Sequence, residues 1–324
     1  SLYRATDVLA RTGHDALAKQ YDAHLRLMKK NVVPIFYDPA AKKLRAEAKL
    51  EGGNGRPPGE NRYSNNVAHY FLDDPYEGLM LGHFADLFGD WRAHPEGKDV
   101  LWKEPRRKPA THETQGRKVT VSEGHWFSSH EDWGFLVLPF RDVPVADRLF
   151  LNAQKARTTY SADRGWQGLF ASTTLPLRSG RLDPRYLSAL GVKGVNKQRV
   201  SQRMVFTPYA AFPLALADKQ VFASWLRRML ETPRVWTEHG IGESYSDHGK
   251  KVAPLLTWDG KALPLIAWMG GIGADVREQM KRDGVYEAFV TRVKADYARF
   301  DGLPILGDDV SLVPPAARKA TVQE

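Results

Sequence analysis

The sequence predicts a mainly α-helical protein, folded as an antiparallel helical toroid whose long loops form a cleft at one end. Apolar residues at helical spacing recur along most of the 324 residues, whereas strand patterns are few and short. The helical segments also alternate with polar loops that are rich in Gly, Trp and carboxylates. We expect one domain over residues 1–313 and a flexible tail over residues 314–324.

In the N-terminal half, apolar spacing predicts a long amphipathic helix over residues 2–30. Residues 50–62 contain four Gly and two Pro, which predicts a loop. The further elements expected in this half are helices over 66–71, 77–91, 132–140 and 144–159, a loop over 92–118 and a strand over 119–121.

In the C-terminal half, the same spacing predicts helices over 184–190, 208–230, 260–269 and 274–300. The segment 260–269 is apolar, and we expect it to be a buried helix.

Composition excludes several classes of protein. Apolar residues make up 42% and charged residues 26%, which is typical of a globular chain and not of a disordered one. No run approaches the roughly 18 apolar residues of a membrane-spanning helix. The absence of cysteine removes thiol nucleophiles, disulfides and thiolate zinc sites. The net charge of +9 comes in short scattered runs without a nucleic-acid-binding motif, so we expect a solvated basic surface and no nucleic-acid partner.

The first segment with candidate chemistry is residues 71–78, which holds Asp73, Asp74 and Glu77 at an expected break between helices. These carboxylates could face a cleft. They could equally cap a helix and support its first turn, where negative charge is favoured.

The second segment is residues 122–134, which holds three carboxylates, two His and two Trp. Its His, Glu and Asp side chains could bind a metal ion, but the His-Glu-x-x-His spacing of a helical zinc site is missing, so we expect no metal ion. A carboxylic acid flanked by indoles has its ionised form desolvated, which raises its pKa. Glu131 is therefore the first candidate for a general acid.

The third segment is residues 236–248, where Gly240 and Gly242 allow tight turns after a long helix. It offers Glu238, Glu243 or Asp247 as a second carboxylate. The alternative interpretation is a glycine that ends the helix, followed by an ordinary loop. No Gly-x-Ser-x-Gly elbow or phosphate-binding glycine loop is present, and we expect no cofactor.

Three phrases carry a family resemblance: residues 166–172 (WQGLFAS), 207–211 (TPYAA) and 236–247. Their order is similar to that in the glucoamylase-like (α/α)6-toroid proteins, a group that includes bacterial endo-β-1,2-glucanases. The resemblance covers roughly residues 120–270, while residues 73–77 do not match the acidic motif of that family. It implies an (α/α)6-type toroid, complete or incomplete, that acts on a polysaccharide. Together with the missing cysteines and a first residue other than Met, it favours a periplasmic or secreted protein.

The leading hypothesis is a glycoside hydrolase that cleaves a bacterial polysaccharide with two carboxylates, one as general acid and one as base or nucleophile. Glu131 is the expected acid, with Glu77 or Glu243 opposite. The side chains expected to bind sugar are Trp126, His130, Trp133, Asp74, Asn65, Arg157, Trp166, Trp236, Tyr245 and His248.

Two alternatives remain open at this point. A polysaccharide lyase on a similar helical scaffold would use Arg157 to neutralise a uronic acid, and Tyr160, His130 or Tyr245 as the base. A non-catalytic glycan-binding protein would bind oligosaccharide without cleaving it.

Overall fold

The computed structural model describes residues 2–51, 62–74, 76, 78–175, 185–201, 203–246 and 249–316. Packing of the backbone divides the chain into two compact units. Unit 1 comprises residues 1–107, 137–143 and 273–301, and unit 2 comprises residues 108–136, 144–272 and 302–324. The prediction of a single domain over residues 1–313 stays a prediction.

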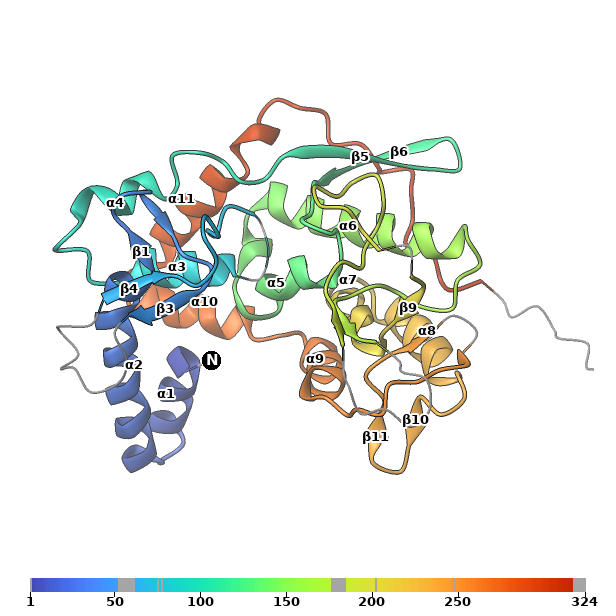
Figure 1. Cartoon of the computed structure of the whole chain (residues 1–324), viewed down its shortest axis with the longest axis horizontal. Coiled ribbons are helices and arrows are strands. Elements are labelled where there is room, and N and C mark those ends of the chain that lie inside the picture. The colour runs from blue at the N-terminus through green and yellow to red at the C-terminus, as the bar shows by residue number, and fades with distance from the viewer. Residues whose placement is uncertain are drawn as a thin grey trace, which may run out of the picture. The chain divides into compact units, whose positions relative to one another are not determined.

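Unit 1 is built mainly from helices, with two small antiparallel strand pairs, β1–β2 and β3–β4 (Figure 1). Its elements are α1 (Leu2–Arg11), α2 (Asp15–Phe36), β1 (Tyr37–Asp38), β2 (Lys43–Leu44), β3 (Ala48–Glu51), β4 (Arg62–Asn65), α3 (Leu79–Phe88), α4 (Pro95–Val100), the 3₁₀ turn η3 (Phe140–Asp142), α10 (Gly273–Arg282), α11 (Tyr286–Asp296) and the 3₁₀ turn η6 (Ala298–Phe300).

The core of unit 1 forms where α2 and α3 pack together, with Val33 and Leu79 among its buried residues. His83 of α3 is fully buried against the rings of Trp102 and Phe289, at centroid distances of 4.6 and 5.2 Å. Burial lowers the pKa of His83 to about 3, and the nearby Arg106 adds to the shift, so this histidine is a neutral core residue at physiological pH.

Unit 2 contains the following elements: β5 (Pro109–Thr114), β6 (Arg117–Ser122), the 3₁₀ turn η2 (Ser129–Asp132), α5 (Trp133–Val137), α6 (Pro144–Ala162), β7 (Thr173–Thr174), β8 (Tyr186–Leu187), β9 (Val205–Phe206), the 3₁₀ turn η4 (Pro208–Ala211), α7 (Phe212–Ala217), α8 (Lys219–Leu230), β10 (Trp236–Thr237), β11 (Gly240–Ile241), β12 (Tyr245–Ser246) and α9 (Trp258–Trp268).

The buried helix α7 organises unit 2, because it packs against α6, α8 and α9. The antiparallel β5–β6 hairpin, in which His112 pairs with Val119, lies on α6. The pair β9–β12 joins two segments that are far apart in the sequence, whereas β7–β8 joins the two ends of a shorter loop.

Several boundaries differ from the sequence prediction. The helix expected over residues 2–30 is two helices, because Gly13 adopts a φ of +80° that ends α1 and turns the chain into α2. The helices expected over 208–230 and 274–300 are likewise broken, the first at Asp218, whose carboxylate caps α8, and the second after Gly284, which has a φ of +71°.

Other predictions were wrong in type. Residues 66–71 form turns instead of a helix, α3 begins at Leu79, and residues 95–100 are helical within an expected loop. The described part of 184–190 contains the short strand β8. The loop expected over 50–62 falls mostly on residues 52–61, which lie outside the described residues.

The predicted strand over 119–121 and the helix pair over 132–140 and 144–159 are confirmed. The prediction of a mainly helical protein is also confirmed. Of the expected tail, residues 317–324 lie outside the described residues, while the carbonyl of Ala316 accepts a hydrogen bond from Arg228 at 2.9 Å.

Candidate active site

The acidic and aromatic loop before α5 is folded around the carboxylate of Glu131. One oxygen accepts the backbone N–H groups of Trp126 and Phe127 at 3.0 and 2.8 Å. The other accepts the backbone N–H and the hydroxyl of Ser128 at 2.8 and 3.1 Å, and the Ser128 hydroxyl in turn accepts the N–H of His130. This is a capping box, in which Ser and the Glu three residues later satisfy each other's backbone donors. The role of Glu131 as general acid stays a prediction.

His130 links this loop to two distant segments. Its ring stacks on Trp133, with centroids 5.1 Å apart and planes 15° apart. Its Nε2 lies 3.2 Å from both the Tyr209 hydroxyl and the Ser172 carbonyl oxygen. Since the Tyr209 hydroxyl also donates to Ser172, these contacts tie η2 and α5 to η4 and to the residue that precedes β7.

Beneath the loop lies a buried ion pair between Arg157 of α6 and Asp132. Arg157 also donates to the side-chain oxygen of Gln154 at 2.9 Å, and the Gln154 amide donates to Asp132 at 2.9 Å. Burial lowers the pKa of Arg157 to about 10, although the charge of Glu131 opposes the shift. With only 4% of its surface exposed, Arg157 is positioned to hold Asp132 and the loop; its predicted contact with sugar stays a prediction.

Glu243 lies between β11 and β12 and is only 3% exposed. Thr173 donates a hydroxyl hydrogen bond to one of its oxygens at 3.0 Å, and the Thr257 hydroxyl donates to the other. Burial raises the pKa of Glu243, and the charge of Asp259 adds to the rise, while the two threonine hydrogen bonds oppose it. A carboxyl group that retains its proton more readily than usual is suited to acid catalysis.

Asp259 is the second carboxylate in this part of unit 2. It is partly buried in the first turn of α9, directly after Trp258. The cap of that helix is Thr257, whose hydroxyl accepts the N–H of Gly260 at 3.2 Å while it donates to Glu243. Glu243 therefore fixes the start of the helix that carries Asp259.

The aromatic candidates have different environments. Tyr245 is fully buried, and its hydroxyl donates to the Gln167 carbonyl at 2.9 Å. Trp166 is partly buried between Tyr160 and Phe170, at centroid distances of 5.4 Å to each. Trp236 on β10 is 62% exposed, so its ring is open to solvent and to a ligand.

The remaining aromatic and polar candidates are dispersed. Trp126 is partly buried with the His125 ring edge-on against it, 4.3 Å between centroids. Asn65 ends β4, and both it and Asp74 are partly buried residues of unit 1. The candidates Glu77 and His248 lie outside the described residues.

Sequence reasoning missed Thr173, Thr257 and Asp259. A signal for the last two was present, since Thr257 precedes an apolar helical segment and is followed two residues later by an acidic one, which is typical of a helix start. Nothing in the sequence indicates that Thr173 meets a carboxylate 70 residues away.

Within the described ranges, no group of three or more His, Asp or Glu side chains is arranged to hold a metal ion. Across the same residues, none of the helices is long and apolar enough to cross a membrane.

The whole chain, residues 1–324, matches the family model of endo-β-1,2-glucanase SGL, GH162. The structure is similar to that of the endo-β-1,2-glucanase from Talaromyces funiculosus in complex with sophorose, with a TM-score of 0.88 and 30% identity over 97% of this chain. A mutant of the same enzyme in complex with β-1,2-glucan gives the same values. The chain spans 64% of the length of this relative. A search of curated protein sequences gives no match.

A fold likeness extends further, to a candidate glucoamylase from Bacteroides caccae, with a TM-score of 0.50 and 13% identity over 92% of this chain and 68% of that one. Fold and comparisons together thus define a helical protein of the glycoside hydrolase class. The chain belongs to the endo-β-1,2-glucanase SGL family. The family resemblance predicted from residues 166–172, 207–211 and 236–247 is confirmed.

Proposed function

We propose that this protein hydrolyses β-1,2-glucan at bonds within the polymer. The observation that carries the proposal is the match of the SGL family model to the whole chain. It is supported by the relative that shares 30% identity over 97% of the chain and whose solved complexes contain sophorose and β-1,2-glucan. Membership of a hydrolase family also favours hydrolysis over the lyase alternative.

Hydrolysis of a glycosidic bond needs one carboxyl group that gives a proton to the leaving oxygen and a second that activates water or attacks the sugar. Glu243 is the candidate for the first role, because burial raises its pKa and the adjacent Asp259 disfavours its ionisation. Asp259 is the candidate for the second, since it is less buried and lies in the turn that Glu243 fixes through Thr257.

The exposed indole of Trp236 offers a flat apolar surface to the C–H face of a glucose ring. It belongs to the β10–β11 hairpin, and the carbonyl of His239 at the tip of that hairpin accepts a hydrogen bond from Lys261 of α9 at 3.1 Å. The hairpin is therefore attached to the helix that carries Asp259, so the proposed sugar-binding ring and the proposed carboxylate belong to connected segments.

The proposal extends to architecture and location. We infer an (α/α)6-type toroid with the loops at one end forming the substrate cleft, in keeping with the alternation of helices and polar loops. We further propose a periplasmic or secreted location, supported by the lack of cysteine. Fractionation of the native host, followed by immunodetection, tests the location; recovery in the cytosolic fraction would rule it out.

The catalytic assignment is tested with four isosteric variants assayed on β-1,2-glucan: Glu243→Gln, Asp259→Asn, Glu131→Gln and Glu77→Gln. We expect the first two to lose at least about a thousandfold in kcat, because removal of an acid or base in the reaction costs several kcal/mol. Glu238→Gln is the matched control, as its side chain is 85% exposed on the same segment. If Glu131→Gln or Glu77→Gln loses activity while Glu243→Gln and Asp259→Asn retain it, the assignment to Glu243 and Asp259 is wrong.

A further inference from the structure

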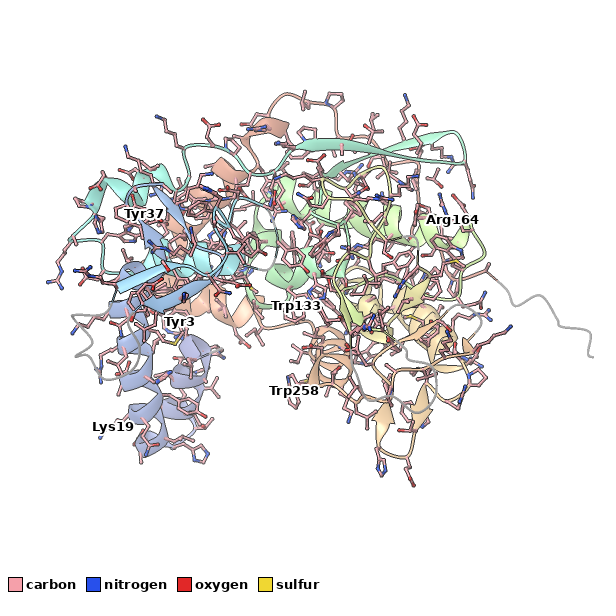
Figure 2. The ribbon with its side chains drawn as sticks, viewed as in Figure 1. Tyr3, Lys19, Tyr37, Trp133, Arg164 and Trp258 are labelled. Carbon is pink, nitrogen blue, oxygen red and sulfur yellow. The ribbon has the colours of Figure 1, made fainter. Side chains whose placement is uncertain are left out.

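Among the described residues, Trp258 is the most exposed large apolar side chain, with 78% of its surface open to solvent (Figure 2). It is the first residue of α9 and directly precedes Asp259. Within the same part of the chain, neither an aromatic ring nor a cation stacks on its indole. The sequence predicts a helix buried over 260–269, yet α9 is covered on only one face, where it packs on α7. Exposed apolar side chains that gather in one place mark interaction surfaces.

The backbone that carries Trp258 is held in place by hydrogen bonds. Thr257 caps α9 by accepting the N–H of Gly260 at 3.2 Å, and its hydroxyl donates to the buried Glu243. The backbone N–H of Glu243 donates to the carbonyl of Leu255 at 2.9 Å. The segment that enters α9 is therefore anchored twice to one buried residue. A ring that extends from a fixed backbone loses little conformational entropy when a ligand binds to it.

A second exposed indole lies on the element that packs against this turn of α9. Trp236 of β10 is 62% exposed and pairs with Ile241 across the β10–β11 hairpin. A Cβ at Gly260 would lie 3.9 Å from the carbonyl oxygen of Ile241, so the hairpin contacts the first turn of the helix. Trp236 and Trp258 therefore belong to two elements that pack directly on each other.

The groups that accompany the two indoles suit a sugar better than an apolar partner. At the tip of the hairpin, Glu238 and His239 are 85% and 74% exposed. On α9, Lys261 is exposed and Asp259 is partly buried. A sugar ring offers a C–H face that packs on an aromatic ring, while its hydroxyls need hydrogen-bonding groups at the edge. Flat indoles with charged side chains on the same elements supply both.

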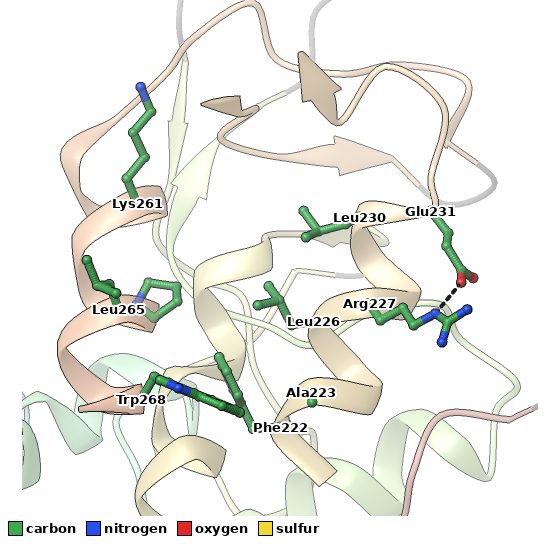
Figure 3. A pocket seen from close by; sticks show the side chains of 10 residues that line it. Phe222, Ala223, Leu226, Arg227, Leu230, Glu231, Lys261, Leu265 and Trp268 are labelled. Atoms are coloured by element: carbon green, nitrogen blue, oxygen red, sulfur yellow. Dashed lines mark hydrogen bonds and ion pairs between the residues drawn. The ribbon is translucent and has the colours of Figure 1, made fainter. Parts of the chain in front are cut away.

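Trp268, at the other end of α9, has a different environment. Figure 3 shows it at the opposite end of the helix from Lys261. Its ring lies 5.5 Å from that of Phe222, and the Nζ of Lys219 lies 5.5 Å from its centroid. It also lines the apolar groove of about 780 Å³ between α8 and α9. Trp268 is thus partly covered by its own protein and serves as a matched control for Trp258.

We propose that Trp258 is a second sugar-stacking residue, and that Trp236 and Trp258 form one extended binding surface for a β-1,2-glucan chain. The identity of the polymer rests on the proposed function, whereas the surface itself rests on the two exposed indoles and the contact between their elements. Because Trp258 directly precedes Asp259, a glucan chain bound on its ring lies beside the candidate carboxylate.

The test measures binding of β-1,2-glucan by calorimetry to chains that carry Asp259→Asn, which limits digestion of the ligand. We expect Trp258→Ala and Trp236→Ala each to raise the Kd about fivefold, and the double variant to raise it about 25-fold, because separate stacking contacts add. Trp258→Phe retains an aromatic face and should preserve most of the affinity. Trp268→Ala should leave the Kd unchanged. Since Trp258 and Trp236 are exposed, their replacement should not alter the melting temperature.

Three results would overturn the proposal. The first is a Kd that Trp258→Ala leaves at the parent value. The second is an equal loss of affinity in Trp268→Ala, which would remove the distinction between the two ends of α9. The third is self-association in sedimentation measurements that Trp258→Ala abolishes without any change in the Kd, since the indole would then contact a second copy of the chain.

Activity measurements separate this inference from the proposed function. If the wild-type chain binds β-1,2-glucan through Trp258 but releases no reducing ends, the proposed hydrolysis is wrong and the binding surface stands. If the wild type and Trp258→Ala release reducing ends with the same KM, hydrolysis stands and the proposed role of Trp258 is wrong.

Discussion

The buried pair of Arg157 and Asp132 leads to a quantitative prediction. Replacing Arg157 with Met retains much of the side-chain volume but leaves Asp132 buried without its cationic partner. Of the bonds described above, Asp132 then keeps only the hydrogen bond from the Gln154 amide. Removing one partner of a buried ion pair costs about 3–5 kcal/mol. The free energy of unfolding should fall by that amount, which corresponds to a shift of the urea midpoint of about 1–2 M.

The assay is urea unfolding followed by circular dichroism. Arg227→Met is the matched control, because Arg227 is 83% exposed and its pair with Glu231 should contribute less than about 1 kcal/mol. Adding Asp132→Asn to Arg157→Met should recover part of the lost free energy of unfolding, since the buried carboxyl group without a cationic partner is then replaced by a neutral amide. If Arg157→Met unfolds at the wild-type urea concentration but loses affinity for β-1,2-glucan, Arg157 contacts substrate and its structural role as derived above is incorrect.

Four further changes have defined outcomes. Gly191→Ala would place a Cβ 1.7 Å from the carbonyl oxygen of Trp126, so the free energy of unfolding should fall by about 1–3 kcal/mol in urea; an unchanged midpoint would show that the loop can move aside. Glu131→Ala leaves three backbone N–H groups without their acceptor and should cost about 1–2 kcal/mol in the same assay, whereas a neutral effect would argue against the capping role. Because the pKa of Glu243 is raised in the folded state, that state binds more protons than the unfolded chain above about pH 4.3. Stability should therefore decline as pH rises from there through the folded pKa, and Glu243→Gln should remove this part of the decline. Trp236→Ala should leave stability within about 0.5 kcal/mol but raise the KM for β-1,2-glucan by about fivefold, equal to about 1 kcal/mol; an unchanged KM would remove Trp236 from the sugar-binding surface.

The sequence could predict those elements of the fold that depend on local signals. The alternating residues 119–121 and the helical spacing over 144–159 specify their structures by short-range preferences, and both elements are present. The prediction of one helix over 2–30 is wrong at Gly13, which adopts a left-handed conformation and ends the first helix. The prediction missed this break because the apolar periodicity continues across Gly13. Periodicity reports which face is apolar and does not detect a single turn residue within it.

The candidate site was predictable only in part. Ser128 and Glu131 have the spacing of a capping box, so the local role of Glu131 was visible in the sequence, although its flanking indoles favoured an acid. The environment of Glu243 was not visible in the sequence, since Thr173 and Thr257 contact it from different segments of the chain. Contacts of that kind depend on tertiary packing, which a single sequence does not encode in any local pattern.

The most direct measurement of the central claim is a time course of β-1,2-glucan digestion by the purified chain, with reducing ends, product sizes and absorbance at 230–240 nm recorded together. An endo-acting hydrolase predicts reducing ends without absorbance, and early products that are oligosaccharides of mixed length. Because β-1,2-glucan has no uronic acid from which to eliminate, a uronic-acid polysaccharide is digested in parallel, and products from it that absorb at 230–240 nm would show elimination in place of hydrolysis. Binding of β-1,2-glucan without any new reducing end would contradict the proposed activity and favour a glycan-binding protein.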